Sequence, residues 1–177
     1  MQKLSKSNRL RLLYGGILLL GILLDQLTKW LAVEFLSTRA TLPLWEGVLH
    51  LTYVENTGAA FGILKNHRWV FLVFSSIAIL ALAVYLFRGV SYLSDKREDG
   101  TYPPIGMLGG VALSLIVSGG IGNMIDRLWL GYVVDFIDFR LINFAVFNGA
   151  DSFVCVGAAL LALHLLLPLF QKKNKLQ

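Results

Sequence analysis

Four long apolar runs constrain the fold of this chain more than any other feature. They cover residues 10–33, 69–87, 105–125 and 153–170. A helix rises about 1.5 Å per residue, so about 20 apolar residues cross a hydrocarbon core that is roughly 30 Å thick. Charged residues make up only 15% of the 177 residues, whereas soluble domains carry roughly 25%. The sequence therefore predicts an all-α integral membrane protein, a single domain over 1–177 with four transmembrane helices.

The distribution of Lys and Arg predicts the orientation of these helices. Ten of the sixteen lie in the N-terminal segment 1–11, the loop 88–104 and the tail 171–177. Because cytoplasmic segments carry the excess of basic residues, we expect both termini in the cytoplasm and the loops 34–68 and 126–152 on the extracytoplasmic side. This clustering also accounts for the net charge of +5. Since no basic stripe is left to follow a phosphate backbone, no nucleic-acid partner is predicted.

The first outward loop contains a short β pattern. Residues 49–54 (LHLTYV) alternate in polarity and are rich in β-forming residues, which predicts a strand and hence a small extracytoplasmic β element. The preceding segment 42–47 (LPLWEG) contains Pro and Gly and favours a turn.

Two aspartates in the second outward loop are candidate catalytic groups. Asp135 lies between Val134 and Phe136, where partial desolvation would raise its pKa and let it hold a proton near neutral pH. Asp151 lies where the fourth helix begins, and a helix N-terminus favours the ionised carboxylate. Such a pair can supply an acid and a base. The alternatives are a solvated strand aspartate for Asp135 and a helix cap for Asp151; Asp138 is a weaker candidate because Arg140 can neutralise it.

A polar group also closes the third apolar run. Asn123, Asp126 and Arg127 are spaced to lie on one helical face, where they could bind a substrate backbone and fix the catalytic groups. Asp126 could instead form an ion pair with Arg127 or with Lys29. Carboxylates beside membrane-spanning sequence are costly to maintain and are therefore functional candidates.

Other chemistries find little support. His50, His67 and His164 lie in different segments without ligand spacing, and no HExxH motif is present, so no zinc site is predicted. Neither a nucleophile elbow nor a phosphate-binding glycine loop occurs, and no cofactor is expected. Cys155 stands alone in an apolar run.

Five segments, taken together, resemble the bacterial lipoprotein signal peptidases, also called signal peptidase II or prolipoprotein signal peptidases. They are residues 25–29 (DQLTK), 56–61 (NTGAAF), 119–127 (GGIGNMIDR), 133–136 (VVDF) and 147–151 (FNGAD). The segments occur in the family's order, interleaved with the four predicted spans, so the resemblance covers nearly the whole chain.

The resemblance implies an aspartic endopeptidase of the bacterial inner membrane, a multi-pass protein with its active site at the extracytoplasmic face. Its substrates would be prolipoproteins, cleaved just before the cysteine that carries diacylglycerol. Such enzymes need no metal and are inhibited by the cyclic peptide globomycin. The family's catalytic aspartates fall on Asp135 and Asp151. Its supporting and substrate-binding residues fall on Asp25, Lys29, Asn56, Gly58, Asn123, Asp126, Arg127 and Asn148.

Two further hypotheses compete with a peptidase. In the first, Asp25, Lys29, Asp126 and Arg127 form a proton relay in a small membrane transporter or proton-conducting protein. In the second, the protein is a membrane scaffold whose carboxylates serve only as caps and ion pairs.

Overall fold

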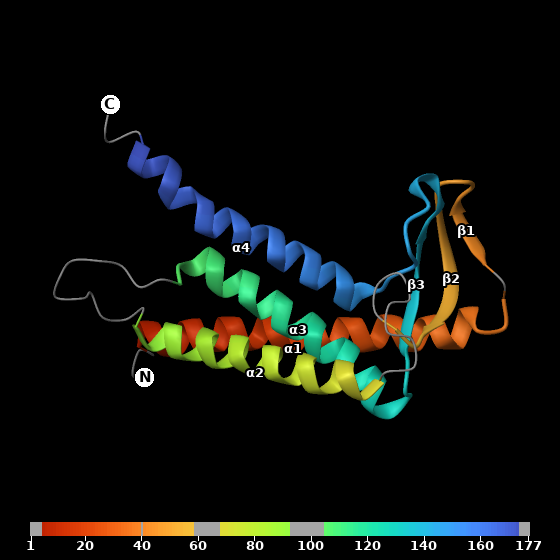
Figure 1. The fold of residues 1–177 in the computed structure, drawn as a ribbon, viewed down its shortest axis with the longest axis horizontal. Helices are drawn as coiled ribbons and strands as arrows, with labels where there is room; N and C mark the ends of the chain where they lie inside the picture. The colour runs from red at the N-terminus through yellow and green to blue at the C-terminus, as the bar shows by residue number, and fades with distance from the viewer. Residues whose placement is uncertain (1–4, 40, 59–67, 93–104, 174–177) are drawn as a thin grey trace.

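The computed structural model describes residues 5–39, 41–58, 68–92 and 105–173 as four helices and a three-stranded sheet (Figure 1). In chain order the elements are α1 (Lys6–Leu36), β1 (Leu42–Trp45), β2 (Leu49–Asn56), α2 (Arg68–Tyr92), α3 (Met107–Trp129), β3 (Val133–Phe139), the short 3-10 helix η2 (Arg140–Ile142) and α4 (Gly149–Lys173). All four helices contain a segment long and apolar enough to cross a membrane, so the predicted membrane bundle is present.

Helix α3 forms the centre of the bundle and contacts each of the other three helices. Half of its apolar segment is buried, compared with 11–17% in α1, α2 and α4. The remaining helix surface is exposed and apolar, as expected for side chains that face lipid. In Figure 1 α3 and α4 slant in the same direction across the line of α1, and α4 lies farther from α1 toward its C-terminal end.

Small residues on α3 allow its neighbours to approach closely. A Cβ atom at Gly119 would meet the carbonyl oxygen of Ala150 on α4, and one at Gly110 would meet the ring of Tyr14 on α1. On α4, a Cβ at Gly157 would lie 2.7 Å from the carbonyl oxygen of Ala112. Small residues at such positions are the usual device for close helix packing in membranes.

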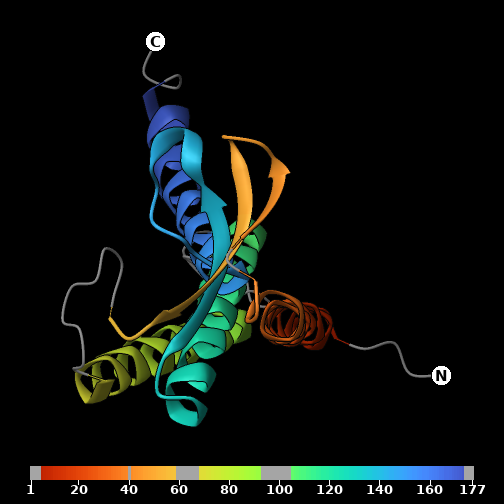
Figure 2. The same ribbon diagram turned by 90° about the vertical axis from the view of Figure 1, so that its right-hand side faces the viewer.

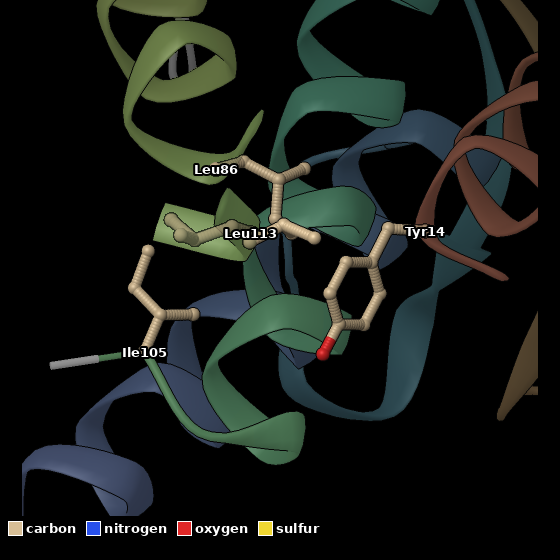
Figure 3. Packing of buried hydrophobic residues seen from close by; sticks show 5 residues of the cluster. Tyr14, Leu86, Ile105 and Leu113 are labelled. Carbon is tan, nitrogen blue, oxygen red and sulfur yellow. The ribbon is translucent and has the colours of Figure 1, made fainter. Parts of the chain in front are cut away.

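Two apolar clusters hold the opposite ends of the molecule. One contains Tyr14, Leu86, Ile105 and Leu113, which join α1, α2 and α3 at the end away from the sheet (Figure 3). The other lies at the end of α1, where Ala32 and Leu36 pack against Val134 of β3 with neighbouring side chains of β2. The second cluster fixes the sheet to the end of α1.

The sheet is antiparallel, with strand order β1-β2-β3, and its strands run across the helix direction (Figures 1 and 2). The predicted strand is confirmed as the first six residues of β2. The turn predicted over residues 42–47 is partly wrong, because Leu42–Trp45 pairs with β2 as strand β1 and only the following residues turn. Pairing across the sheet outweighed the local turn preference of Pro43, which lies on an edge strand, where proline is tolerated. An irregularity in β2 between Leu51 and Val54 shifts the register with β3, so that Val54 lies opposite Asp135.

The glycine contacts lead to a stability prediction. Gly119→Ala and Gly157→Ala should each lower the free energy of unfolding by about 1–3 kcal/mol, because the added methyl group overpacks the α3–α4 contact. Gly15→Ala is the matched control, since nothing lies within 4 Å of a Cβ there. It should be neutral or stabilising by up to about 1 kcal/mol through helix propensity. Thermal unfolding in detergent, followed by circular dichroism, measures all three; equal melting temperatures would contradict the close α3–α4 contact.

Candidate active site

Asp135 and Asp151 line the same pocket, which has a volume of about 750 Å³. Asp135 is contributed by β3 and Asp151 by the first turn of α4. The rest of the lining is mostly apolar and comes from β2 and the residues that follow it, α3, β3, the segment before α4 and α4 itself. Two carboxylates in a largely apolar pocket at the ends of membrane helices are energetically costly. Such an arrangement therefore indicates a functional site.

Two asparagine side chains join these carboxylates. The Nδ2 of Asn148 donates to Asp135 Oδ1 at 2.7 Å and to Asn123 Oδ1 at 3.0 Å. Asn123 in turn donates from its Nδ2 to Asp151 Oδ1 at 2.8 Å. The chain of amides therefore fixes one oxygen of each carboxylate and orients the two groups relative to each other.

Asp151 also takes part in a helix cap. Its Oδ2 accepts from the backbone N–H of Asn148 at 3.3 Å, and Asn148 Oδ1 accepts from the N–H of Asp151 at 2.9 Å. This reciprocal pair is a capping box at the start of α4. The capping role proposed for Asp151 as an alternative is thus present, and it leaves the same side chain on the pocket wall.

Burial raises the affinity of the Asp135 carboxylate for a proton. The carboxyl group is almost fully buried, and this desolvation, together with the nearby Asp151, raises its pKa to about 6. Hydrogen bonds from Asn56, at 2.8 Å to Oδ2, and from Asn148 act in the opposite direction. The raised pKa confirms the expectation drawn from its apolar neighbours in sequence, and it means that the protonated form persists to near-neutral pH.

A buried ammonium group supports the site from the side of α1. Lys29 Nζ lies 2.9 Å from Asp25 Oδ2 and 3.0 Å from Asp126 Oδ2, and it donates to Asn123 Oδ1 at 2.8 Å. All three charged side chains are at most 4% exposed. The ion pair of Asp126 with Lys29, considered as an alternative from sequence, is therefore present, and through Asn123 it reaches the pocket.

The same two carboxylates bind the backbone of the segments that carry the catalytic candidates. Asp126 Oδ2 accepts from Val134 N–H at 3.1 Å, and Asp25 Oδ1 accepts from Ala150 N–H at 2.8 Å. Each donor, Val134 or Ala150, lies one residue before a pocket aspartate in the chain. The charge cluster thus holds β3 and the start of α4 against α1 and α3.

Sequence reasoning missed Gln26. Its Nε2 lies 3.0 Å from Asp126 Oδ1, 3.2 Å from the carbonyl oxygen of Gly122 and 3.2 Å from Asp25 Oδ2. These contacts make it a positioning residue for both acidic members of the cluster. Its place inside the segment 25–29 was the available signal, since Gln26 directly follows Asp25 in that short polar segment.

Arg127 lies at the pocket edge and holds the segment that follows β2. Its Nη2 donates to the carbonyl oxygen of Gly58 at 3.1 Å, and its Nη1 donates to that of Asn123 at 3.3 Å. Gly58 N–H donates to Asn56 Oδ1 at 2.9 Å, which leaves the Nδ2 of Asn56 for Asp135. All the predicted site residues are thereby gathered at one end of the bundle; residues 59–61 of the motif that begins at Asn56 lie outside the described residues.

Asp138 belongs to a different environment. It accepts from Thr52 Oγ1 at 2.7 Å and from Arg140 Nε at 2.9 Å, and it is not among the residues that line the pocket. Although partial burial alone would raise its pKa, the bonds from Thr52 and Arg140 lower it. Its weaker standing as a candidate follows from this pairing. Within the described ranges, no cluster of three or more His, Cys, Asp or Glu side chains could hold a metal ion.

Comparisons with known proteins agree on one family. Residues 17–167 match the family model described as signal peptidase (SPase) II. The lipoprotein signal peptidase of Clostridioides difficile is 42% identical over 164 residues, covering 93% of this chain and all of the relative. That of Halothermothrix orenii is 42% identical over 149 residues, covering 84% and 92%. Two solved structures of bacterial membrane enzymes superpose with TM-scores of 0.73 and 0.70 at 27% and 32% identity. They cover 100% and 94% of this chain, and 96% and 97% of their own.

The buried cluster predicts that Lys29 is essential for stability. Lys29→Met should lower the free energy of unfolding by about 3–5 kcal/mol, because it leaves two buried carboxylates without their cation. Arg140→Gln is the control, since it removes a partly exposed pair and should cost about 1 kcal/mol or less. Chemical or thermal unfolding of the purified variants gives both values. A Lys29→Met variant as stable as the wild type would show that the cluster contributes nothing to the fold.

The raised pKa of Asp135 predicts a pH dependence. Its folded-state pKa of about 6 lies above the unfolded value of about 3.9, so the folded state binds more protons between these values. The stability that this group contributes is therefore complete below about pH 4 and is lost as the pH rises through 6. Asp135→Asn should remove this loss. Unfolding of wild type and variant from pH 4 to 7.5 tests the sign; parallel pH profiles would contradict it.

Proposed function

Because the chain belongs to the signal peptidase II family, we propose that it is an aspartic endopeptidase that removes signal peptides from prolipoproteins. Cleavage would occur just before the cysteine that carries diacylglycerol, and Asp135 and Asp151 would be the catalytic residues. The observation that carries the proposal is the placement of both carboxylates in one pocket, linked by Asn148 and Asn123.

The proposed reaction divides the work between the two aspartates. Asp151, in the ionised form that a helix N-terminus favours, takes a proton from a water molecule, and the water oxygen attacks the carbonyl carbon of the scissile peptide bond. Asp135, protonated because its pKa is raised, donates to the carbonyl oxygen. Collapse of the tetrahedral intermediate then breaks the C–N bond, and the amine leaves with a proton from the pair.

The surrounding polar residues would serve this reaction by positioning. Asn148 and Asn56 each donate to one oxygen of Asp135, which orients the carboxyl group toward the pocket. Lys29 contributes positive charge through Asn123 and moderates the repulsion between the two carboxylates. Arg127 fixes the backbone at Gly58 along one pocket edge, where an extended signal peptide could lie.

The pocket also suits a substrate that is anchored in lipid. Its apolar lining includes Val154 and Val156 on α4, a membrane-spanning helix, so the diacylglyceryl group could reach the pocket from the bilayer. We further propose that this protein is a multi-pass protein of the bacterial inner membrane, with both termini in the cytoplasm and the pocket on the extracytoplasmic side. The distribution of Lys and Arg supports this orientation.

Substitution of the two aspartates tests the proposal. Asp135→Asn and Asp151→Asn should each reduce turnover of a diacylglyceryl-modified prolipoprotein by on the order of 10²–10⁴-fold, because each removes an acid or base from the reaction. Asp138→Asn is the matched control from the same strand, and it should retain activity. Cleavage is followed by mass spectrometry of the released signal peptide in proteoliposomes.

Folding must be measured with the same samples. The predicted inhibitor globomycin should raise the melting temperature of the wild type, because a ligand that binds only the folded state stabilises it.

Near-normal turnover by either Asn variant would refute the aspartic mechanism. Loss of proton flux in liposomes on Asp25→Asn, in a protein without cleavage activity, would instead favour the transporter hypothesis.

A further inference from the structure

The end of the sheet farthest from the pocket aspartates carries an unusually apolar surface, which we call the sheet tip. It consists of Leu44 and Trp45, at the end of β1, and Leu141 and Ile142, in η2. The four side chains expose between 58% and 69% of their surface. The two segments are adjacent, because Leu141 N–H donates to the carbonyl oxygen of Val48 in the turn that begins at Trp45.

The sheet tip lies outside the four membrane-spanning segments. Clusters of large exposed apolar side chains are rare on surfaces in contact with water, and they mark sites of interaction. Trp in particular is enriched where a protein surface meets the boundary between acyl chains and headgroups, since its indole N–H remains hydrated while its ring is buried.

The length of α1 gives the depth of the sheet relative to the membrane. Counted from Leu12, which follows Arg11, a hydrocarbon core of roughly 30 Å takes up about 20 helical residues and ends near Leu31. The sheet packs against Ala32 and Leu36, just beyond that point. It therefore lies within the headgroup layer, which adds roughly 5–8 Å on each side of the core. A tilted α1 would place the sheet deeper.

The strand direction keeps the tip at this depth. In Figure 1 the strands run across the helices near the end of α1, and in Figure 2, where α1 is seen end-on, β1 and β2 extend upward from it within the plane of the picture. The tip consequently projects away from α1 along the plane of the membrane surface.

From this geometry we propose that the sheet tip inserts into the lipid headgroup layer on the pocket side of the membrane. The partner is the phospholipid surface itself: the apolar side chains contact the upper acyl chains, as in interfacial amphipathic segments. Arg140, between the strand and the tip, is 41% exposed at its side chain, so its guanidinium can also face headgroup phosphates.

This contact would also fix the position of the pocket. Phe139 of β3 stacks on Phe147 at a centroid distance of 6.0 Å, and Phe144 packs edge-on against Phe147 at 5.7 Å. Phe144 and Phe147 line the pocket. The lipid contact of the tip is therefore transmitted through a continuous aromatic cluster to one pocket wall.

Quenching of Trp fluorescence by brominated phospholipids tests the proposal. Wild type and Trp45→Phe are placed in nanodiscs that each hold one copy of the protein, and the difference between their spectra is the emission of Trp45. Most of this emission should be lost when the lipids carry bromine at the headgroup end of the acyl chains, and less when bromine lies at the chain ends. Trp30→Phe, at a lipid-facing position of α1, is the control that shows the assay detects lipid contact.

Other outcomes would overturn the proposal. Equal Trp45 emission in brominated and ordinary lipids, together with strong quenching by acrylamide in water, would place the tip in solvent. Protection from both quenchers would mean that protein covers the tip. An independent reporter, an environment-sensitive dye on Leu141→Cys in a Cys155→Ser background, should show emission shifted to the blue that brominated lipids quench. Cleavage activity does not enter these readouts, so they stand or fall apart from the proposed peptidase.

Discussion

The ammonium group of Lys29, held between Asp25 and Asp126, is the interaction on which the rest of the site depends. Its two carboxylate partners come from α1 and α3. Asp126 also accepts from a backbone N–H of β3, and Asp25 also accepts from a backbone N–H of α4. Four elements thus meet at one cation. A buried ion pair by itself is weak support for stability, but here every partner also fills a hydrogen-bonding role, so that removing one charge leaves several polar groups unpaired.

The location of this cluster explains how a membrane bundle can tolerate it. Lys29 lies about half a turn before the end of the hydrocarbon core, as estimated from the length of α1. The sheet, packed on Ala32 and Leu36, covers this end of the bundle and supplies Asp135 and Asn56 to the pocket. The glycines on α3 complete the arrangement, since a side chain at Gly122 would meet the carboxylate of Asp25. In this region, therefore, the close packing of α1 against α3 and the burial of the Asp25 carboxylate depend on each other.

The sequence was sufficient for the parts of the fold that depend on local pattern. The apolar runs predicted the four spans, and the alternation in residues 49–54 predicted β2. Helix α1, however, extends from Lys6 to Leu36, beyond the apolar run, because a helix continues through polar residues that find partners. Strand β1 was not predicted as a strand because its pairing with β2 is not visible in the local sequence, whereas Pro43 and Gly47 favour a turn locally.

The site was predictable as a set of residues but not as a network. Motif order indicated which polar residues belong together, yet the role of Gln26 depends on residues about a hundred positions away, which no local pattern reveals. The same holds for Asn148, whose Oδ1 caps α4 while its Nδ2 reaches Asp135 and Asn123. Both ends of one amide are used, so the geometry of the helix start and the geometry of the aspartate pair cannot vary independently. Asp151 also makes both kinds of contact, because its Oδ2 takes part in the capping box while its Oδ1 accepts from Asn123. When each residue is considered alone, a structural role and a catalytic role are competing interpretations. In the structure, different atoms of the same side chain can serve both roles.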